Sequence, residues 1–130
     1  MDHAIRRKLV DLARIRGAKI SYQALSDEFQ LNLDMKKKKD RSFMVKVLSE
    51  ISEYEFKQSR PLLSSLVLLK GRTGKQMDEF YKLCEELGMG GWEDLKSNPD
   101  FESEQRKSCH LFWKENQNYK EYRFIYDEVV

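Results

Sequence analysis

Apolar side chains recur along the chain at helical spacing, beginning with residues 2–16. The apolar positions of this stretch are four, three and one residues apart, which places them on one helical face: Ile5, Leu9, Leu12 and Ala13. Asp2 precedes these apolar positions and Gly17 follows them. Because aspartate favours the N-cap and glycine the position after the last turn, we predict a helix between them.

Two further helices are predicted before Pro61. Residues 22–29 follow Ser21, a predicted N-cap, and are too few to be helical alone in water, so they must pack on the first helix. Residues 43–57 carry an apolar stripe after a cap at Asp40 or Ser42. The stripe consists of Phe43, Val47, Leu48, Ile51 and Tyr54, with Met44 beside it. The lysine-rich segment 31–41 is predicted to be a solvated loop.

The chain beyond Pro61 is predicted to form one strand and further helices. The apolar run 62–69 indicates a buried strand, and the glycine-containing segment 71–74 a turn. Helical spacing returns over 77–87, a single turn is expected at 92–95, and a last helix spans 101–119. Residues 122–130 are either extended or a frayed helical tail. The fold class is therefore mainly α with a small β element, a winged helix-turn-helix-like core followed by C-terminal helices.

Charge divides the chain into a basic and an acidic part. The 130 residues fit one domain, 1–130, with 40% hydrophobic residues for its core. Residues 1–75 carry 17 Lys and Arg against 9 Asp and Glu, and residues 76–130 carry 7 against 13. A basic core with an acidic helical C-terminal part indicates a polyanion or an acidic protein as partner, unless the dipolar surface serves only solubility.

Several protein classes are disfavoured by the sequence. No run approaches the ~20 apolar residues of a membrane span, and the charged N-terminus lacks the apolar stretch of a secretion signal. Two cysteines, Cys84 and Cys109, cannot build a disulfide scaffold and are expected to be reduced thiols. We therefore expect a cytoplasmic protein that contacts no membrane.

Two stretches resemble bacterial proteins. Residues 20–26 (ISYQALS) resemble the "T/S-Y-x-x-L-A" second helix of many bacterial winged-helix proteins. Residues 47–64 resemble a group of small, poorly characterised bacterial proteins with a pattern close to "LGEISxYExxxGRPLLSxLVV", whose later "GFFxLAxELG" helix corresponds to residues 80–88. This chain departs from that pattern at Ser59, where the group has glycine, and at residues 75–76, where the group has a proline in the turn.

A more distant resemblance is to the winged-helix domain of alkyltransferase-like DNA repair proteins. Their element order is similar, but their reactive Pro-Cys-His-Arg motif is absent, since Pro61 is followed by two leucines. The resemblance therefore implies a fold and no alkyl-transfer activity.

The sequence offers little for catalysis or for a cofactor. Cys109 and His110 are adjacent, which separates their side chains by ~100° on a helix, so no metal site is predicted. Cys84 lies on an apolar stripe and is expected to fill space. The segment 71–75 lacks the spacing of a phosphate-binding loop. Glu55 and Arg60 are expected to form a structural ion pair across a helix end. We predict no enzyme and no cofactor.

The basic residues are the best functional candidates. They precede or begin the third helix, or flank the later turn. The candidates are Lys36, Lys37, Lys38, Lys39, Arg41, Lys46, Lys70, Arg72 and Lys75. A helix-turn-helix protein presents the N-terminal part of its second motif helix to DNA, and lysines there bind phosphates. The prediction is non-enzymatic binding of nucleic acid, most readily DNA.

A protein-interaction module is the alternative prediction. It would act as an adaptor or inhibitor, for instance in bacterial or phage defence, through the aromatic C-terminal part, if those side chains are exposed. They are Phe112, Trp113, Tyr119, Tyr122, Phe124 and Tyr126.

Overall fold

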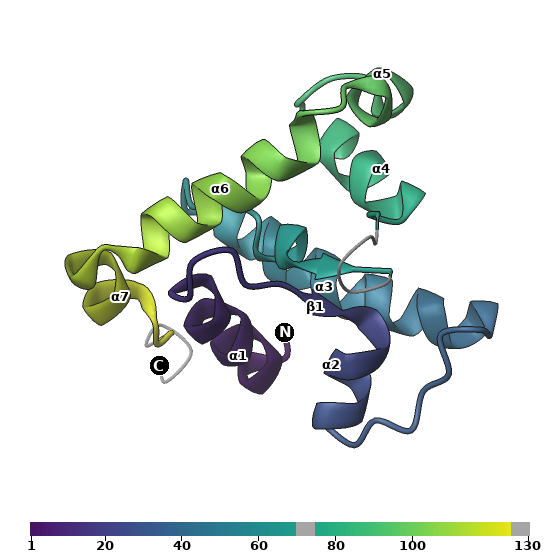
Figure 1. The fold of residues 1–130 in the computed structure, drawn as a ribbon, viewed down its shortest axis with the longest axis horizontal. Helices are drawn as coiled ribbons and strands as arrows, with labels where there is room; N and C mark the ends of the chain where they lie inside the picture. The colour runs from purple at the N-terminus through teal and green to yellow at the C-terminus, as the bar shows by residue number, and fades with distance from the viewer. Residues whose placement is uncertain (70–74, 126–130) are drawn as a thin grey trace.

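The computed structural model describes residues 1–69 and 75–125, and their fold is mainly helical with a small two-stranded sheet (Figure 1). The first elements are α1 (His3–Ala13), β1 (Ile20–Ser21), α2 (Tyr22–Glu28), α3 (Lys38–Lys57), η1 (Leu63–Leu66) and β2 (Val67–Leu68). They are followed by α4 (Asp78–Glu86), α5 (Trp92–Ser97), α6 (Phe101–Lys114) and α7 (Asn116–Tyr122). Helix α6 runs diagonally across the molecule and connects the α4–α5 pair with α7 (Figure 1).

Side-chain caps begin the first two helices as predicted. Asp2 accepts a hydrogen bond from the backbone N–H of Ile5, and Ser21 accepts one from that of Ala24. Each cap satisfies a donor that the helix itself leaves unpaired. Gly17 has a φ of +72°, the left-handed conformation that turns the chain away from α1 toward β1.

Helix α3 begins at Lys38, so the prediction of a loop through residue 41 is wrong. Neither Asp40 nor Ser42 is the N-cap; Lys37 is, without a side-chain cap, and Asp40 lies in the first turn. The negative charge of Asp40 is favourable at that end of the helix dipole and offsets the repulsion among the lysines. The buried stripe also differs, because Met44 is buried while Phe43 is 50% exposed.

The predicted strand over 62–69 is mostly a 3₁₀ helix, η1, and only Val67 and Leu68 pair with a strand. They lie parallel to Ile20 and Ser21. The pairing is short because β1 ends at Ser21, which is already the N-cap of α2. Among the described residues, β2 therefore has only this two-residue strand to pair with. The polar groups of η1 are satisfied locally instead: the hydroxyl of Ser52 accepts from the backbone N–H of Ser64, and the side chain of Gln76 donates to the carbonyls of Ser64 and Ser65.

The C-terminal helices follow the prediction with one correction. Helix α4 falls within the predicted 77–87, and α5 extends the single turn expected at 92–95. The predicted last helix 101–119 is broken at Glu115, whose extended backbone separates α6 from α7. The predicted turn at 71–74 and most of the predicted tail at 122–130 lie outside the described residues.

Both the basic and the acidic part of the chain contribute to the larger hydrophobic core. This core joins residues of α1, α2 and α3 to Cys109 and Trp113 of α6. A smaller cluster holds α4 against the start of α6 through Phe80, Tyr81 and Phe101. Because Trp113 is completely buried, α6 is fixed against the N-terminal helices along its C-terminal half.

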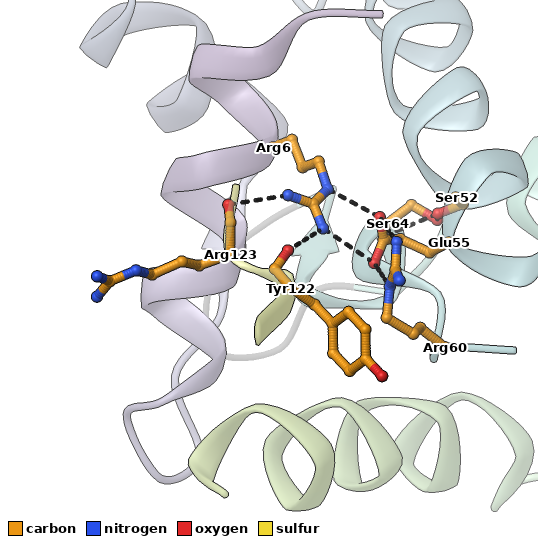
Figure 2. Close-up of polar contacts among 7 residues, drawn as sticks. All are labelled: Arg6, Ser52, Glu55, Arg60, Ser64, Tyr122 and Arg123. Atoms are coloured by element: carbon orange, nitrogen blue, oxygen red, sulfur yellow. Dashed lines mark hydrogen bonds and ion pairs between the residues drawn. The ribbon is translucent and has the colours of Figure 1, made fainter. Parts of the chain in front are cut away.

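A buried ion cluster connects α1, α3 and the C-terminal segment (Figure 2). The carboxylate of Glu55 accepts from Nε of Arg6 at 2.8 Å and from Nε of Arg60 at 2.8 Å. The remaining donors of Arg6 reach the backbone carbonyls of Tyr122 and Arg123 at 2.8 and 3.0 Å. The predicted pairing of Glu55 with Arg60 is thus confirmed, and Arg6 is a second partner that lies 49 residues away in sequence.

The turn after α3 brings Arg60 back to Glu55. Ser59 has a φ of +59°, and the backbone N–H of Arg60 donates to the carbonyl of Glu55 at 2.9 Å. Burial is the largest single effect and lowers the pKa of Arg60, but the hydrogen bonds and charges of Glu55 and Tyr54 together outweigh it, and the pKa is raised. Arg60 therefore stays charged.

Replacing Glu55 with Gln tests the cluster. The variant leaves two guanidinium groups near the core without their anion, so we expect a loss of about 3–5 kcal/mol in the free energy of unfolding. The measurement is urea unfolding followed by circular dichroism, with Glu86→Gln, an exposed carboxylate on α4, as the control. Equal midpoints for the two variants would contradict a stabilising role for the cluster.

Candidate nucleic-acid interface

Four of the predicted lysines gather at the N-terminal end of α3, which projects from the rest of the molecule (Figure 1). Lys36 and Lys37 lie in the turn before the helix, Lys38 and Lys39 lie in its first turn, and all four are exposed. Arg41 and Lys46 follow on the helix. Residues 34–46 hold six cations against two carboxylates, so this end of α3 is strongly basic.

The segment that carries the lysines is held by hydrogen bonds from α2 and α3. Gln23 of α2 accepts from the backbone N–H of Met35 at 2.9 Å and donates to the carbonyl of Leu33 at 2.8 Å. Arg41 of α3 donates to the carbonyl of Met35 at 2.8 Å. The carboxylate of Asp40 accepts from the backbone N–H of Asp34 at 2.8 Å. The lysines are therefore presented from a fixed backbone.

Within the described ranges 1–69 and 75–125, the lysines of this surface form no ion pair. They are Lys36, Lys37, Lys38, Lys39, Lys46 and Lys75. A phosphate that binds them displaces only water and counterions, with no internal ion pair to break.

An apolar ring interrupts the basic surface. Phe43 is 50% exposed and lies one turn after Lys39 and one turn before Lys46. Residues four and three positions apart share a helix face, so the three side chains form one stripe.

Four of the predicted residues line one depression between α3 and the α4–α6 region, with a volume of about 970 Å³. They are Lys38, Arg41, Lys46 and Lys75. Asp78, Glu79 and Glu102 line the same depression, and Asp78 pairs with Lys96 at 2.6 Å. Acidic and basic side chains are therefore mixed in this depression, and the free cationic surface is the outer end of α3. Lys70 and Arg72 lie outside the described residues.

A second basic surface was missed in the sequence. Arg106, His110 and Lys114 recur at intervals of four on α6, and they line a groove together with Arg14 and Arg16, which follow α1. The spacing of four was a visible signal. The negative overall charge of residues 76–130 conceals this signal, because the charge along α6 changes sign between Glu104 and Arg106.

The C-terminal aromatic side chains are mostly packed rather than exposed. Trp113 is completely buried, and Phe112, Tyr119 and Tyr122 pack against the core. Phe124 is 42% exposed, and the guanidinium of Arg7 lies 4.3 Å from its ring centre. The exposure on which the alternative prediction depends is therefore absent at Trp113, and Tyr126 lies outside the described residues.

Both cysteines are buried thiols. Cys84 fills space in the smaller cluster as predicted, and Cys109 donates to the carbonyl of Leu62 at 3.0 Å. Burial raises the pKa of each thiol to about 12. A nucleophilic thiolate is therefore strongly disfavoured at both positions.

Comparisons with protein-family models, with curated proteins and with solved structures find no match. Among residues 1–69 and 75–125, no group of three or more His, Cys, Asp or Glu side chains is placed to hold a metal ion. In the same part of the chain, none of the helices has both the length and the apolar character that a membrane crossing requires.

Both thiols should resist modification while the protein is folded. At pH 8 a thiol with a pKa of about 12 is ionised to the order of 10⁻⁴. We expect no reaction with Ellman's reagent in buffer and two thiols per chain in 8 M urea. Fast modification of either thiol in the folded protein would contradict this burial.

Proposed function

We propose that this protein binds nucleic acid, most readily DNA, without chemical transformation, through phosphate contacts at the N-terminal end of α3. The observation that carries the proposal is the projecting cluster of exposed lysines that have no ion-pair partner among the described residues. Each phosphate that a lysine neutralises releases counterions, so binding will be strong at low salt and weaken steeply as salt rises.

The backbone at this end supports the same proposal. Helix α3 has 20 residues, and its N-cap Lys37 offers no side chain to the free N–H groups of the first turn. These N–H groups point along the axis of α3 and, together with the positive end of the helix dipole, favour binding of a phosphate. In this arrangement α2 and α3 serve as the helix-turn-helix pair of a winged-helix-like domain. The backbone N–H of Leu69 donates to the carbonyl of Lys75 at 3.0 Å, so Lys75 lies beside the end of β2.

Phe43 adds an apolar contact to this electrostatic surface. Aromatic rings between cations are suited to stacking on unpaired bases, which is worth ~1–3 kcal/mol per base. Phosphate contacts alone confer affinity without sequence preference. The stripe of Lys39, Phe43 and Lys46 therefore adds a stacking contact for nucleic acid whose bases are accessible.

Neutralising the lysine cluster tests the proposal. The triple variant Lys36→Gln, Lys37→Gln and Lys39→Gln removes three exposed charges and leaves the hydrogen bonds that hold residues 33–37 in place. We expect binding to a 20-base-pair duplex to be lost at 150 mM salt, and the slope of log K against log salt to decrease by up to ~0.9 for each phosphate contact removed. Fluorescence anisotropy at several salt concentrations measures both the affinity for the duplex and the slope of log K against log salt.

The matched control removes three exposed lysines elsewhere: Lys57→Gln, Lys82→Gln and Lys120→Gln. This control has the same net charge as the first variant, so equal losses would mean that only net charge matters. A wild-type protein that ignores DNA at low salt would end the proposal.

Replacing Phe43 with Ala tests the stacking contact. We expect affinity for a single-stranded 20-mer to fall by ~1–3 kcal/mol, while duplex affinity changes little. Phe56→Ala, an exposed phenylalanine at the other end of α3, is the control. Equal losses on both nucleic acids for Phe43→Ala would contradict base stacking.

A further inference from the structure

The groove between the end of α1, with the chain that follows it, and α6 gathers positive charge from two distant parts of the sequence. It has a volume of about 680 Å³. Its cationic lining residues are Arg14, Arg16, Lys19, Arg106, Lys107 and Lys114. None of the described residues that line it is an aspartate or glutamate. This distinguishes the groove from the depression beside α3, where acids and bases are mixed.

The groove is formed by fixed contacts between its two walls. His110 Nδ1 lies 2.8 Å from the carbonyl oxygen of Ala13, and Arg14 donates to the carbonyl of Trp113 at 3.0 Å. Since a carbonyl only accepts, Nδ1 of His110 carries the hydrogen. Trp113 is completely buried beside these contacts, so the two walls are held at a constant separation.

Most of the positive charge in the groove is not neutralised. Arg14 is oriented by neutral groups: it donates to Asn116 Oδ1 at 2.8 Å, and its guanidinium lies 4.2 Å from the ring centre of Tyr119. Arg106 is the exception, since it pairs with Glu102 at 3.0 Å. Arg16, Lys19, Lys107 and Lys114 form no ion pair with any residue of the described ranges.

We propose that this groove is a second anion site, independent of the α3 surface, which binds a ligand carrying several linked phosphates. A single phosphate or sulfate would engage only part of a cationic lining spread over both walls. Arginine supplies planar, bidentate donors for phosphate, and lysine supplies point charges around it. The volume falls within the ~300–1,000 Å³ of small-molecule sites. Leu111, 56% exposed, gives the lining an apolar portion beside the charges.

Titration calorimetry with inorganic tripolyphosphate tests this site in the 130-residue protein. The groove variant is Lys107→Gln with Lys114→Gln, two exposed positions whose loss breaks no ion pair among the described residues. The matched variant is Lys36→Gln with Lys37→Gln at the α3 surface. We expect saturable binding by the wild type, weakened at least about tenfold in the groove variant and less than about twofold in the matched variant.

Equal weakening in the two variants, or no saturable binding by the wild type, would overturn the proposal. Equal competition by sulfate at the same ionic strength would also overturn it, because the groove would then be only a general anion surface. If the groove variant also weakens binding of a single-stranded DNA 20-mer, the linked phosphates belong to a nucleic-acid backbone; if it weakens tripolyphosphate binding alone, they belong to a small ligand. If the wild type binds tripolyphosphate but binds no DNA at low salt, the proposed function is refuted and this site stands.

Discussion

The carboxylate of Glu55 has no exposed surface, and an ionised group at such a depth is stable only when nearby charges and donors replace its hydration. Two guanidinium groups do so, which leaves one positive charge in excess. Arg6 satisfies its remaining donors with the backbone carbonyls of Tyr122 and Arg123 (Figure 2). The cluster therefore fixes α1 and α3 relative to each other and holds the end of α7 against both.

The position of α6 follows from this arrangement together with Trp113. The end of α7 is held by Arg6, and Trp113 is buried between the N-terminal helices, so the C-terminal half of α6 must lie along the chain after α1. Arg14 and His110 then meet backbone carbonyls of the opposite wall. The groove is thus a consequence of how the ion cluster and the tryptophan place the last two helices.

Local chemistry made much of the fold predictable, while long-range contacts did not. The caps at Asp2 and Ser21 and the pairing of Glu55 with Arg60 depend on neighbours within five residues, and all three are confirmed. The start of α3 was misplaced because like charges suggested a loop, although Asp40 and hydrogen bonds to the preceding turn stabilise a helix there. The strand predicted over 62–69 is longer than the observed β2 because the length of β2 is set by its partner β1. The sequence of residues 62–69 contains no information about the length of that partner. Arg6 and the α6 groove depend on contacts about 50 to 100 residues apart in sequence, beyond any local pattern.

The distribution of acids decides how a polyanion can approach the molecule. Asp78, Glu79 and Glu102 line the depression that adjoins the base of the lysine cluster, and their charge repels phosphates along that path. In the proposed function, a nucleic acid bound to the end of α3 therefore follows the outer face of that helix, where Lys39 and Phe43 lie outside the depression. The groove beside α6 has the end of α1 as its other wall, and none of the described residues that line it is an aspartate or glutamate. Because the two basic surfaces draw on different elements, each can be neutralised without altering the other, and their roles can be separated by mutation.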